Sequence, residues 1–176
     1  VGDGILVNNI IPEHLESFTS KMIELGVDLK IDGDKIYVPK VEKMRGIEVN
    51  TNPFPGFATD LQQPLTASLL KAQGRSVVND HIYPERVKHV SELQKMGANI
   101  QHADGVIYVD YTDQLYGANV EAGEIRAGAC LMIAAFMADG TTTITKADNI
   151  LRGYDSLVKK LTKLGAEVEI TADQSL

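Results

Sequence analysis

Residues that mark disulfide-linked, membrane-spanning or nucleic-acid-binding proteins are scarce in this sequence. It holds a single cysteine, Cys130, so no internal disulfide bond can form. Its longest apolar run, Ala129–Ala138, is far shorter than the roughly 20 residues that span a bilayer, and Val1–Gly4 lacks the features of a signal peptide. The net charge of −7 excludes a general affinity for nucleic acid or anionic membranes. We therefore expect a cytoplasmic protein that binds neither.

Signals for metals, cofactors and reactive nucleophiles are also missing. The four histidines have no spacing typical of a zinc site: His14, His81, His89 and His102. Glycines occur singly rather than in a phosphate-binding loop, and no Gly-x-Ser-x-Gly motif is present. Cys130 lies in an apolar segment, which is typical of packing rather than of a reactive thiol. The sequence predicts no metal ion and no cofactor.

An internal repeat is the main positive feature. Gly26, Gly97 and Gly165 stand at the same place in three similar segments, at nearly equal intervals along the chain. Each glycine follows apolar residues of helical period, and glycine is the residue that commonly ends a helix. The segments after the glycines are predicted to be strands: 27–31, 98–102 and 166–170. In the first two copies a turn with Asp and Gly leads to a second strand, over 35–38 or 106–109.

A second repeated segment starts at Gly46 and again at Gly117, with the same interval that separates Gly26 from Gly97. Each is followed by a predicted helix, over 60–73 or 126–138, that we expect to end at Gly74 or Gly140. The next segments are predicted to be strands: 76–78, 141–145 and, at the same place in the first copy, 5–7. The first copy has no helix before its strand, so we expect that helix upstream of Val1.

These elements predict an α/β fold of three βαβαββ repeats around a pseudo-threefold axis, with the helices packed inside the sheets. The chain is expected to be one domain over residues 1–176. The expected units are 1–45, which is truncated at its start, 46–116 and 117–176. Residues 129–138 are apolar nearly all round, which favours burial of that helix between sheets.

Charged residues occupy matched places in two of the units. Asp60 precedes Gly74 by the same interval as Arg126 precedes Gly140, and Arg86 and Arg152 follow these two glycines, again by equal intervals. Equivalent positions lie close together when units share an axis, and arginines near helix starts can hold a phosphate or carboxylate. The plainer interpretation is that the arginines are solvated. The plainer interpretation of Asp60 is that it is an ordinary acidic residue in the first turn of a helix, where Thr59 and Gln62 form a capping box.

Four segments closely resemble UDP-N-acetylglucosamine 1-carboxyvinyltransferases of the enolpyruvyl transferase family: 53–62, 83–98, 124–127 and 152–154. The likeness covers essentially the whole chain. It implies an enzyme that moves the enolpyruvyl group of phosphoenolpyruvate to the 3-hydroxyl of UDP-N-acetylglucosamine and releases phosphate. This is the first committed step of cytoplasmic peptidoglycan synthesis, on which cell shape and division depend. Family members have two such domains with the active site between them, so the second domain is an expected partner.

The resemblance also implies roles for single residues. Asp60 matches the aspartate proposed as general base at the sugar 3-hydroxyl, and Ile82 matches a contact to the UDP-sugar. Arg86 and Arg126 match arginines of the cleft, and Arg152 matches an arginine that contacts phosphoenolpyruvate. Glu124 and Tyr83 are secondary candidates; many members of the family have Asp where Glu124 stands.

Nothing in the chain matches the family's lysine–asparagine pair or its mobile loop with a reactive cysteine. The resemblance therefore implies a fragment from the C-terminal half of the enzyme, inactive by itself. Two alternatives stay open. One is a domain of 3-phosphoshikimate 1-carboxyvinyltransferase, which shares the repeats but not the Phe57–Asp60 string. The other is a repeat module that binds a partner and catalyses no reaction.

Overall fold

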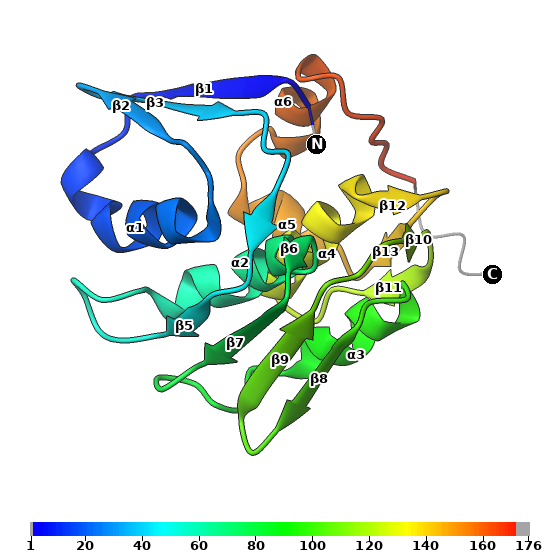
Figure 1. Cartoon of the computed structure of the whole chain (residues 1–176). Coiled ribbons are helices and arrows are strands. Elements are labelled where there is room, and N and C mark those ends of the chain that lie inside the picture. The colour runs from blue at the N-terminus through cyan, green and yellow to red at the C-terminus, as the bar shows by residue number, and fades with distance from the viewer. Residues whose placement is uncertain (1, 172–176) are drawn as a thin grey trace.

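Of the five sheets in the computed structural model, which describes residues 2–171, the three with the longest strands lie around two central helices (Figure 1). The first sheet has the order β1-β3-β2, the second has the order β5-β7-β9-β8, and the third pairs β11 with β13. Their strands are β1 (Gly4–Asn8), β2 (Lys30–Asp32), β3 (Lys35–Pro39), β5 (Glu48–Asn50), β7 (Arg75–Asn79), β8 (Ile100–Ala103), β9 (Val106–Asp110), β11 (Asn119–Glu121) and β13 (Thr143–Thr145).

Helices fill the space between these sheets and cover them. The helices are η1 (Pro12–His14), α1 (Glu16–Leu25), η2 (Thr59–Leu61), α2 (Gln62–Leu69), α3 (Lys88–Lys95), α4 (Ile125–Phe136), α5 (Asp148–Gly153) and α6 (Leu157–Lys163). Helices α2 and α4 pack against each other, and α2 also contacts β7 and β9 (Figure 1). The predicted α/β architecture of repeated units with helices inside sheets is therefore confirmed. Unit boundaries at 45/46 and 116/117 stay a prediction.

The second sheet shows most clearly why the sequence folds in this way. Strands β5 and β7 run parallel, and β7, β9 and β8 are antiparallel neighbours. Alternating side chains of these strands point to the core, so that Val78, Ile107 and Val109 are almost fully buried. The predicted Asp-Gly turn joins β8 to β9, and both Asp104 and Gly105 have positive φ angles.

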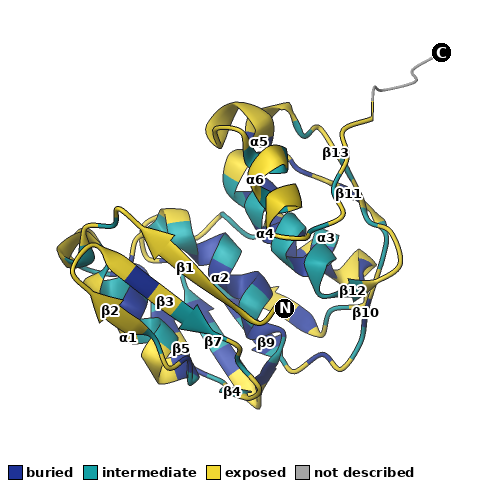
Figure 2. Ribbon diagram, turned by 90° about the horizontal axis from the view of Figure 1, so that it is seen from above, coloured by how far each residue is buried: buried dark blue, intermediate teal, exposed yellow. Residues whose placement is uncertain are grey.

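The central helices are buried to different degrees. Most residues of α2 are buried, whereas α4 buries Ala127, Gly128, Cys130, Leu131 and Ala134 and leaves its other side partly exposed (Figure 2). Burial raises the pKa of the Cys130 thiol, which is the setting of an inert, packed cysteine, as predicted. Across residues 2–171, none of the helices combines the length and the apolar character needed to cross a membrane.

The predicted ends of the two central helices are wrong. Helices α2 and α4 end at Leu69 and Phe136, not at Gly74 and Gly140. The chain between forms two-residue strands: β6 (Ala72–Gln73) pairs with β4 (Met44–Arg45), and β12 (Ala138–Asp139) pairs with β10 (Leu115–Tyr116). The glycines do adopt left-handed φ angles, of +86° each, but they follow these strands. Such short strands form because they pair with residues that lie far away in the sequence, so no local periodicity predicts them.

The predicted strand over 166–170 is also absent. In the two earlier units the equivalent strands, β2 and β8, each pair with the strand that follows, β3 and β9. A strand needs such a partner for its backbone groups. Within the part of the chain that the structure describes, residues 166–170 pair with none and stay irregular. The sequence positions that follow, 172–176, lie outside the described residues.

The first sheet differs from the other two because no helix precedes β1 within residues 2–171. All residues of β1 are exposed (Figure 2). An open groove of about 770 Å³ runs from this sheet to the exposed side of α4, with Ile5, Val38, Ile133 and Phe136 in its lining. The second unit, in contrast, is closed on its inner side by α2.

Candidate functional site

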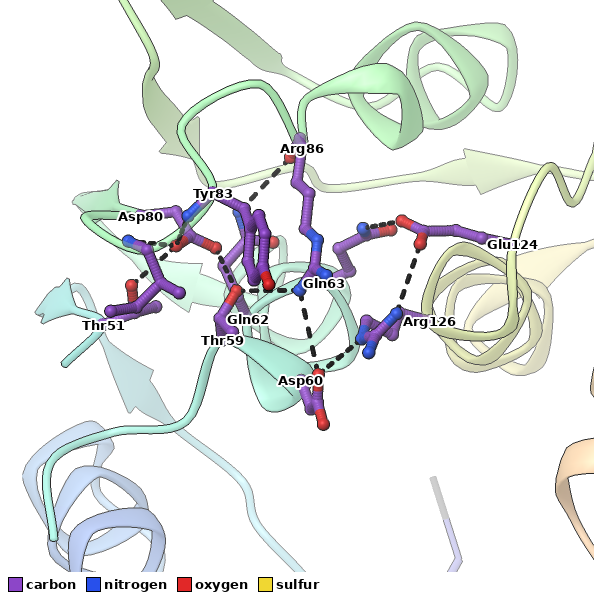
Figure 3. Close-up of polar contacts among 11 residues, drawn as sticks. Thr51, Thr59, Asp60, Gln62, Gln63, Asp80, Tyr83, Arg86, Glu124 and Arg126 are labelled. Carbon is purple, nitrogen blue, oxygen red and sulfur yellow. Dashed lines mark hydrogen bonds and ion pairs between the residues drawn. The ribbon is translucent and has the colours of Figure 1, made fainter. Parts of the chain in front are cut away.

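Charged side chains gather where β5 and β7 end and where α2 and α4 begin (Figure 3). Strands β5 and β7 are parallel neighbours, so their carboxyl ends meet at one edge of the sheet, a common place for ligand sites in α/β proteins. Asp60 comes from η2, Arg86 from the loop between β7 and α3, and Arg126 from the first turn of α4. Residues from two units therefore form one cluster.

Asp60 is the centre of this cluster. Its Oδ1 atom accepts a hydrogen bond of 2.6 Å from Nε of Arg126 and lies 3.8 Å from Nη1 of Arg86 (Figure 3). The structure thus brings Asp60 and Arg126 together, as their matched positions predict. The Asp60 side chain is 65% exposed, against 16% for Arg86 and 28% for Arg126. An accessible carboxylate therefore stands beside two partly buried cations.

Glu124 and Gln63 support Arg126 from the other side. The Glu124 carboxylate lies 3.4 Å from Nη1 of Arg126 and accepts a hydrogen bond of 2.5 Å from Nε2 of Gln63. The hydrogen bond with Asp60 is the main cause that raises the pKa of Arg126, with a contribution from Glu124. Gln63 was not a candidate from the sequence, because a buried glutamine on an inner helix carries no local signal.

Tyr83 and Ile82 lie in the loop after β7. The guanidinium of Arg86 stacks on the ring of Tyr83, with Cζ 3.8 Å from the ring centre (Figure 3). Both Tyr83 and Ile82 have partly exposed side chains, at 42% and 36%. Residues 83–86 form a turn, and α3 begins only at Lys88. Arg86 is therefore held by a loop and not by a helix.

The predicted capping box of Thr59 and Gln62 is wrong. The Thr59 hydroxyl donates to Oδ2 of Asp80 at 2.6 Å and accepts from Nη1 of Arg86 at 3.0 Å, and it caps no helix (Figure 3). The Gln62 side chain donates to the carbonyl of Arg86. In a capping box the Thr59 oxygen would accept from a backbone N–H, but here it accepts from the charged Arg86 while its proton goes to Asp80; charged partners roughly double the strength of a hydrogen bond.

Asp80 is the charged residue of this region that sequence reasoning missed. It is 4% exposed and directly follows β7. One signal could have found it: Asn79-Asp80-x-Ile82 repeats Asn8-Asn9-x-Ile11 at the same interval that separates Gly26 from Gly97. A polar residue at a matched position after a strand is typical of a turn that holds a loop.

Arg152 stands apart from the cluster. The matched spacing predicts that Arg152 stands near a helix start, but Arg152 lies in the last turn of α5, and α6 starts only at Leu157. Among residues 2–171 its side chain has no hydrogen bond or ion pair to the other candidates. A cation in the last turn suits the helix dipole, so this position does not itself call for an anion.

A cavity of about 450 Å³ adjoins the cluster. Gln63, Arg86, Glu124 and the buried His89 of α3 are among its lining residues. Both ring nitrogens of His89 lack a hydrogen-bond partner within the described chain. Burial, helped by the charge of His102 and opposed by that of Asp80, lowers the pKa of His89 to about 4. In residues 2–171, no three His, Cys, Asp or Glu side chains are grouped to hold a metal ion.

His89 predicts a dependence of stability on pH. Unfolding returns its pKa from about 4 to the ordinary 6.5, so between these values the unfolded chain binds a proton that the folded chain does not. The free energy of unfolding contributed by His89 is therefore fully present above pH 6.5 and is lost as the pH falls toward 4. We measure the free energy of unfolding by urea at pH 7 and at pH 4.5. Its decrease between these pH values should be about 2 kcal/mol smaller for His89→Met than for the unchanged protein.

His14→Gln is the matched control, because it removes an exposed histidine in place of a buried one. Equal losses for His89→Met and the unchanged protein would contradict a buried, neutral His89. All other residues are the same in the three proteins, so the difference between their losses isolates the contribution of His89.

Comparison with known proteins assigns this chain to a family. The sequence pattern of the EPSP synthase (3-phosphoshikimate 1-carboxyvinyltransferase) family matches residues 1–161, and the chain belongs to this family. Its fold is similar to that of part of the enolpyruvyl transferase NikO from Streptomyces tendae, with a TM-score of 0.86 at 24% identity over 95% of this chain and 40% of that one. EPSP synthase from Acinetobacter baumannii has a TM-score of 0.75 at 14% identity, over 98% of this chain and 41% of its own.

Within the family, the chain is similar to one kind of enzyme. It is 58% identical, over its whole length, to UDP-N-acetylglucosamine 1-carboxyvinyltransferase 2 of Lactiplantibacillus plantarum, and 56% identical over 97% of its length to the UDP-N-acetylglucosamine 1-carboxyvinyltransferase of Lactobacillus acidophilus. The chain spans about 41% and 40% of the lengths of these two relatives. The family resemblance inferred from the sequence is therefore confirmed.

Proposed function

We propose that this chain is part of an enzyme that transfers enolpyruvyl from phosphoenolpyruvate to the 3-hydroxyl of UDP-N-acetylglucosamine and releases phosphate. The observation that carries the proposal is the exposed Asp60 carboxylate, 2.6 Å from Nε of Arg126 and 3.8 Å from Nη1 of Arg86. The reaction needs a base at the acceptor hydroxyl and cations for the phosphate and carboxylate of the donor. This cluster offers both. The similarity to relatives with this named activity supports the choice of substrates.

The roles of single residues follow from this chemistry. Asp60 takes the proton of the acceptor hydroxyl as that oxygen bonds to C2 of the enolpyruvyl group and C3 takes up a proton; loss of a C3 proton together with phosphate then restores the double bond. Arg86 and Arg126 bind anionic groups, since both guanidiniums lie beside the accessible carboxylate and keep part of their surface exposed. Ile82 contacts the UDP-sugar from the loop after β7, and Tyr83 and Glu124 hold the two arginines in place.

Arg152 binds phosphoenolpyruvate from α5, in a site completed by parts of the enzyme beyond this chain. Its exposed side chain is free of ion pairs with other residues of the described chain, so it can meet an anion from outside. The second domain supplies the rest of the site. The enzyme works in the cytoplasm, and residues 1–176 form one domain with units at 1–45, 46–116 and 117–176.

An assay with alternative acceptors tests the proposed substrates. The full-length enzyme should release phosphate from phosphoenolpyruvate when UDP-N-acetylglucosamine is present and not when 3-phosphoshikimate is present. Calorimetric titration with each acceptor should show binding of the UDP-sugar alone. Turnover with 3-phosphoshikimate only would favour the other enzyme of the family, and binding without turnover would favour a non-catalytic module.

Residues 1–176 alone should release no phosphate under the same conditions, because the chain spans only about 41% of the L. plantarum enzyme's length. The full-length enzyme, assayed in parallel, is the control. Clear turnover by the isolated chain would overturn the proposal that a second domain completes the site.

A further inference from the structure

A buried carboxylate without a counter-ion lies directly behind the arginine cluster. Asp80 is 4% exposed, and within residues 2–171 no lysine, arginine or histidine forms an ion pair with it. A buried charge is unfavourable unless hydrogen bonds replace the water that it has lost. The partners of Asp80 therefore show what it holds in place.

Four hydrogen bonds reach Asp80, divided between its two oxygens. Oδ1 accepts from the Thr51 hydroxyl at 2.7 Å and from the backbone N–H groups of Ile82 and Tyr83 at 3.0 and 2.8 Å. Oδ2 accepts from the Thr59 hydroxyl at 2.6 Å. Burial raises the pKa of Asp80, but these four hydrogen bonds together lower it below the ordinary value. Asp80 is thus a charged acceptor.

The bond to Thr59 fixes how that residue meets Arg86. A hydroxyl has one proton, and Thr59 donates its proton to Asp80, so only its lone pairs remain for Arg86, whose Nη1 donates to it at 3.0 Å. Arg86 also stacks on Tyr83, and the Tyr83 backbone is itself bonded to Asp80. Both of these contacts of the Arg86 guanidinium therefore depend on Asp80 (Figure 3).

The arrangement belongs to the unit that carries Asp60 and Arg86. The residue that precedes Gly26 by the same distance as Asp80 precedes Gly97 is Asn9, and the residue that follows Gly140 as Asp80 follows Gly74 is Lys146. Neither is a carboxylate. A turn that only joined a strand to a helix would have no need of a buried charge, because the other units manage this connection without one.

We propose that Asp80 is a positioning residue of the substrate site: through Thr59 and the backbone of residues 82–83, it holds the guanidinium of Arg86 beside Asp60. This inference rests on the proposed function, in which Arg86 binds an anionic group. Asp80 does not touch the substrate. It determines where Arg86 is when the substrate arrives.

Steady-state kinetics of the full-length enzyme test the proposal. In Asp80→Asn, the amide oxygen can still accept hydrogen bonds from Thr51 and the loop backbone. The amide N–H₂ group, however, donates to the Thr59 oxygen, so that the Thr59 hydroxyl proton is no longer directed toward residue 80. We expect KM for the substrate bound by Arg86 to rise about 10- to 100-fold, the size of a lost hydrogen bond to a charged group, and kcat to change far less. Thr59→Val should match this rise, and Thr59→Ser should restore KM.

A double-mutant cycle separates this role from a merely structural one. If Asp80 acts through Thr59, the double variant Asp80→Asn/Thr59→Val should have about the KM of either single variant. Asp110→Asn is the matched control, because Asp110 is also bound to an arginine, Arg75, by two bonds of 2.8 Å, but lies outside the cluster; it should leave KM unchanged. Additive effects, or an unchanged KM in Asp80→Asn, would overturn the proposal. If Asp80→Asn fails to fold, an unchanged KM in Thr59→Val would overturn the proposal in its place.

A crystal structure of the Asp80→Asn enzyme without ligands gives a readout that is independent of activity. The Arg86 guanidinium should leave Thr59 and the ring of Tyr83. An Arg86 in the same position as in the unchanged enzyme would overturn the inference. Absence of phosphate release by the unchanged enzyme, in contrast, refutes the proposed function and leaves this structural comparison decisive for Asp80.

Discussion

Asp60→Asn in the full-length enzyme is expected to lower kcat by about 10²- to 10⁴-fold, the usual contribution of a general base. The amide has the size of the carboxylate and keeps one oxygen that can accept from Arg126, so the cluster should stay assembled. An amide cannot take the proton of an attacking hydroxyl. The loss should therefore appear in kcat, measured as phosphate release at saturating substrate, with a smaller change in KM.

Asp110→Asn again supplies the control for this experiment. Asp110 belongs to a hydrogen-bonded pair with Arg75 on the second sheet, and its side chain is 27% exposed. Loss of the Asp110 carboxylate should leave kcat within about twofold of the unchanged enzyme, because Asp110 lies outside the cluster and exposed ion pairs contribute little to stability. A rate for Asp60→Asn that equals that of Asp110→Asn would remove Asp60 from the mechanism and leave it as a structural partner of Arg126.

Gly117→Ala should destabilise the fold by about 3 kcal/mol or more, at the upper end of the range for overpacking. A Cβ atom at Gly117 would meet the backbone carbonyl of Thr141, and a Cβ atom at the equivalent Gly46 would meet that of Arg75. Backbone cannot turn aside as a side chain can, and Gly117 is also tied by its N–H to the carbonyl of Asp139 at 2.7 Å. Added atoms must therefore push these two backbone segments apart.

Urea unfolding followed by circular dichroism gives the measurement, and Gly123→Ala gives the control. No atom within 4 Å faces a Cβ at Gly123, and its φ angle lies outside the left-handed region. This variant should change the free energy of unfolding by less than about 1 kcal/mol and can be stabilising. Equal effects of the two substitutions would show that the close approach at Gly117 is not a rigid contact.

The pairing of Asp60 with Arg126 could be predicted from the sequence, because residues at matched places in two repeat units occupy equivalent positions in the fold. Two residues at matched places in neighbouring units are related by the shared axis and lie close together where that place is near the axis, and the hydrogen bond of 2.6 Å between Asp60 and Arg126 agrees with this. The same reasoning failed for Arg152, because α5 and α6 do not reproduce the loop and single helix that carry Arg86. A spacing rule holds only where the elements between the residues are also repeated.

The partners of Thr59 could not be predicted. Its hydroxyl donates to Asp80 and accepts from Arg86, which follow Thr59 by 21 and 27 residues in the sequence, although a local capping box was available. Local patterns indicate what a side chain can do with its neighbours along the chain. They do not show which charged groups folding will place beside it, and hydrogen bonds to charged partners are stronger than the neutral hydrogen bond of a helix cap.

The sequence by itself determined the repeat, the helical and strand segments with their apolar faces, the family, and the residue types that carry the proposed chemistry. These follow from local period and from matched spacing, both of which are properties of the chain alone. Only the tertiary structure decided the two-residue strands at the ends of α2 and α4, the place of Arg152 and the role of Asp80. Each of these depends on a partner that lies far away in the sequence, because strand pairing and the burial of charge are satisfied across the fold and not along the chain.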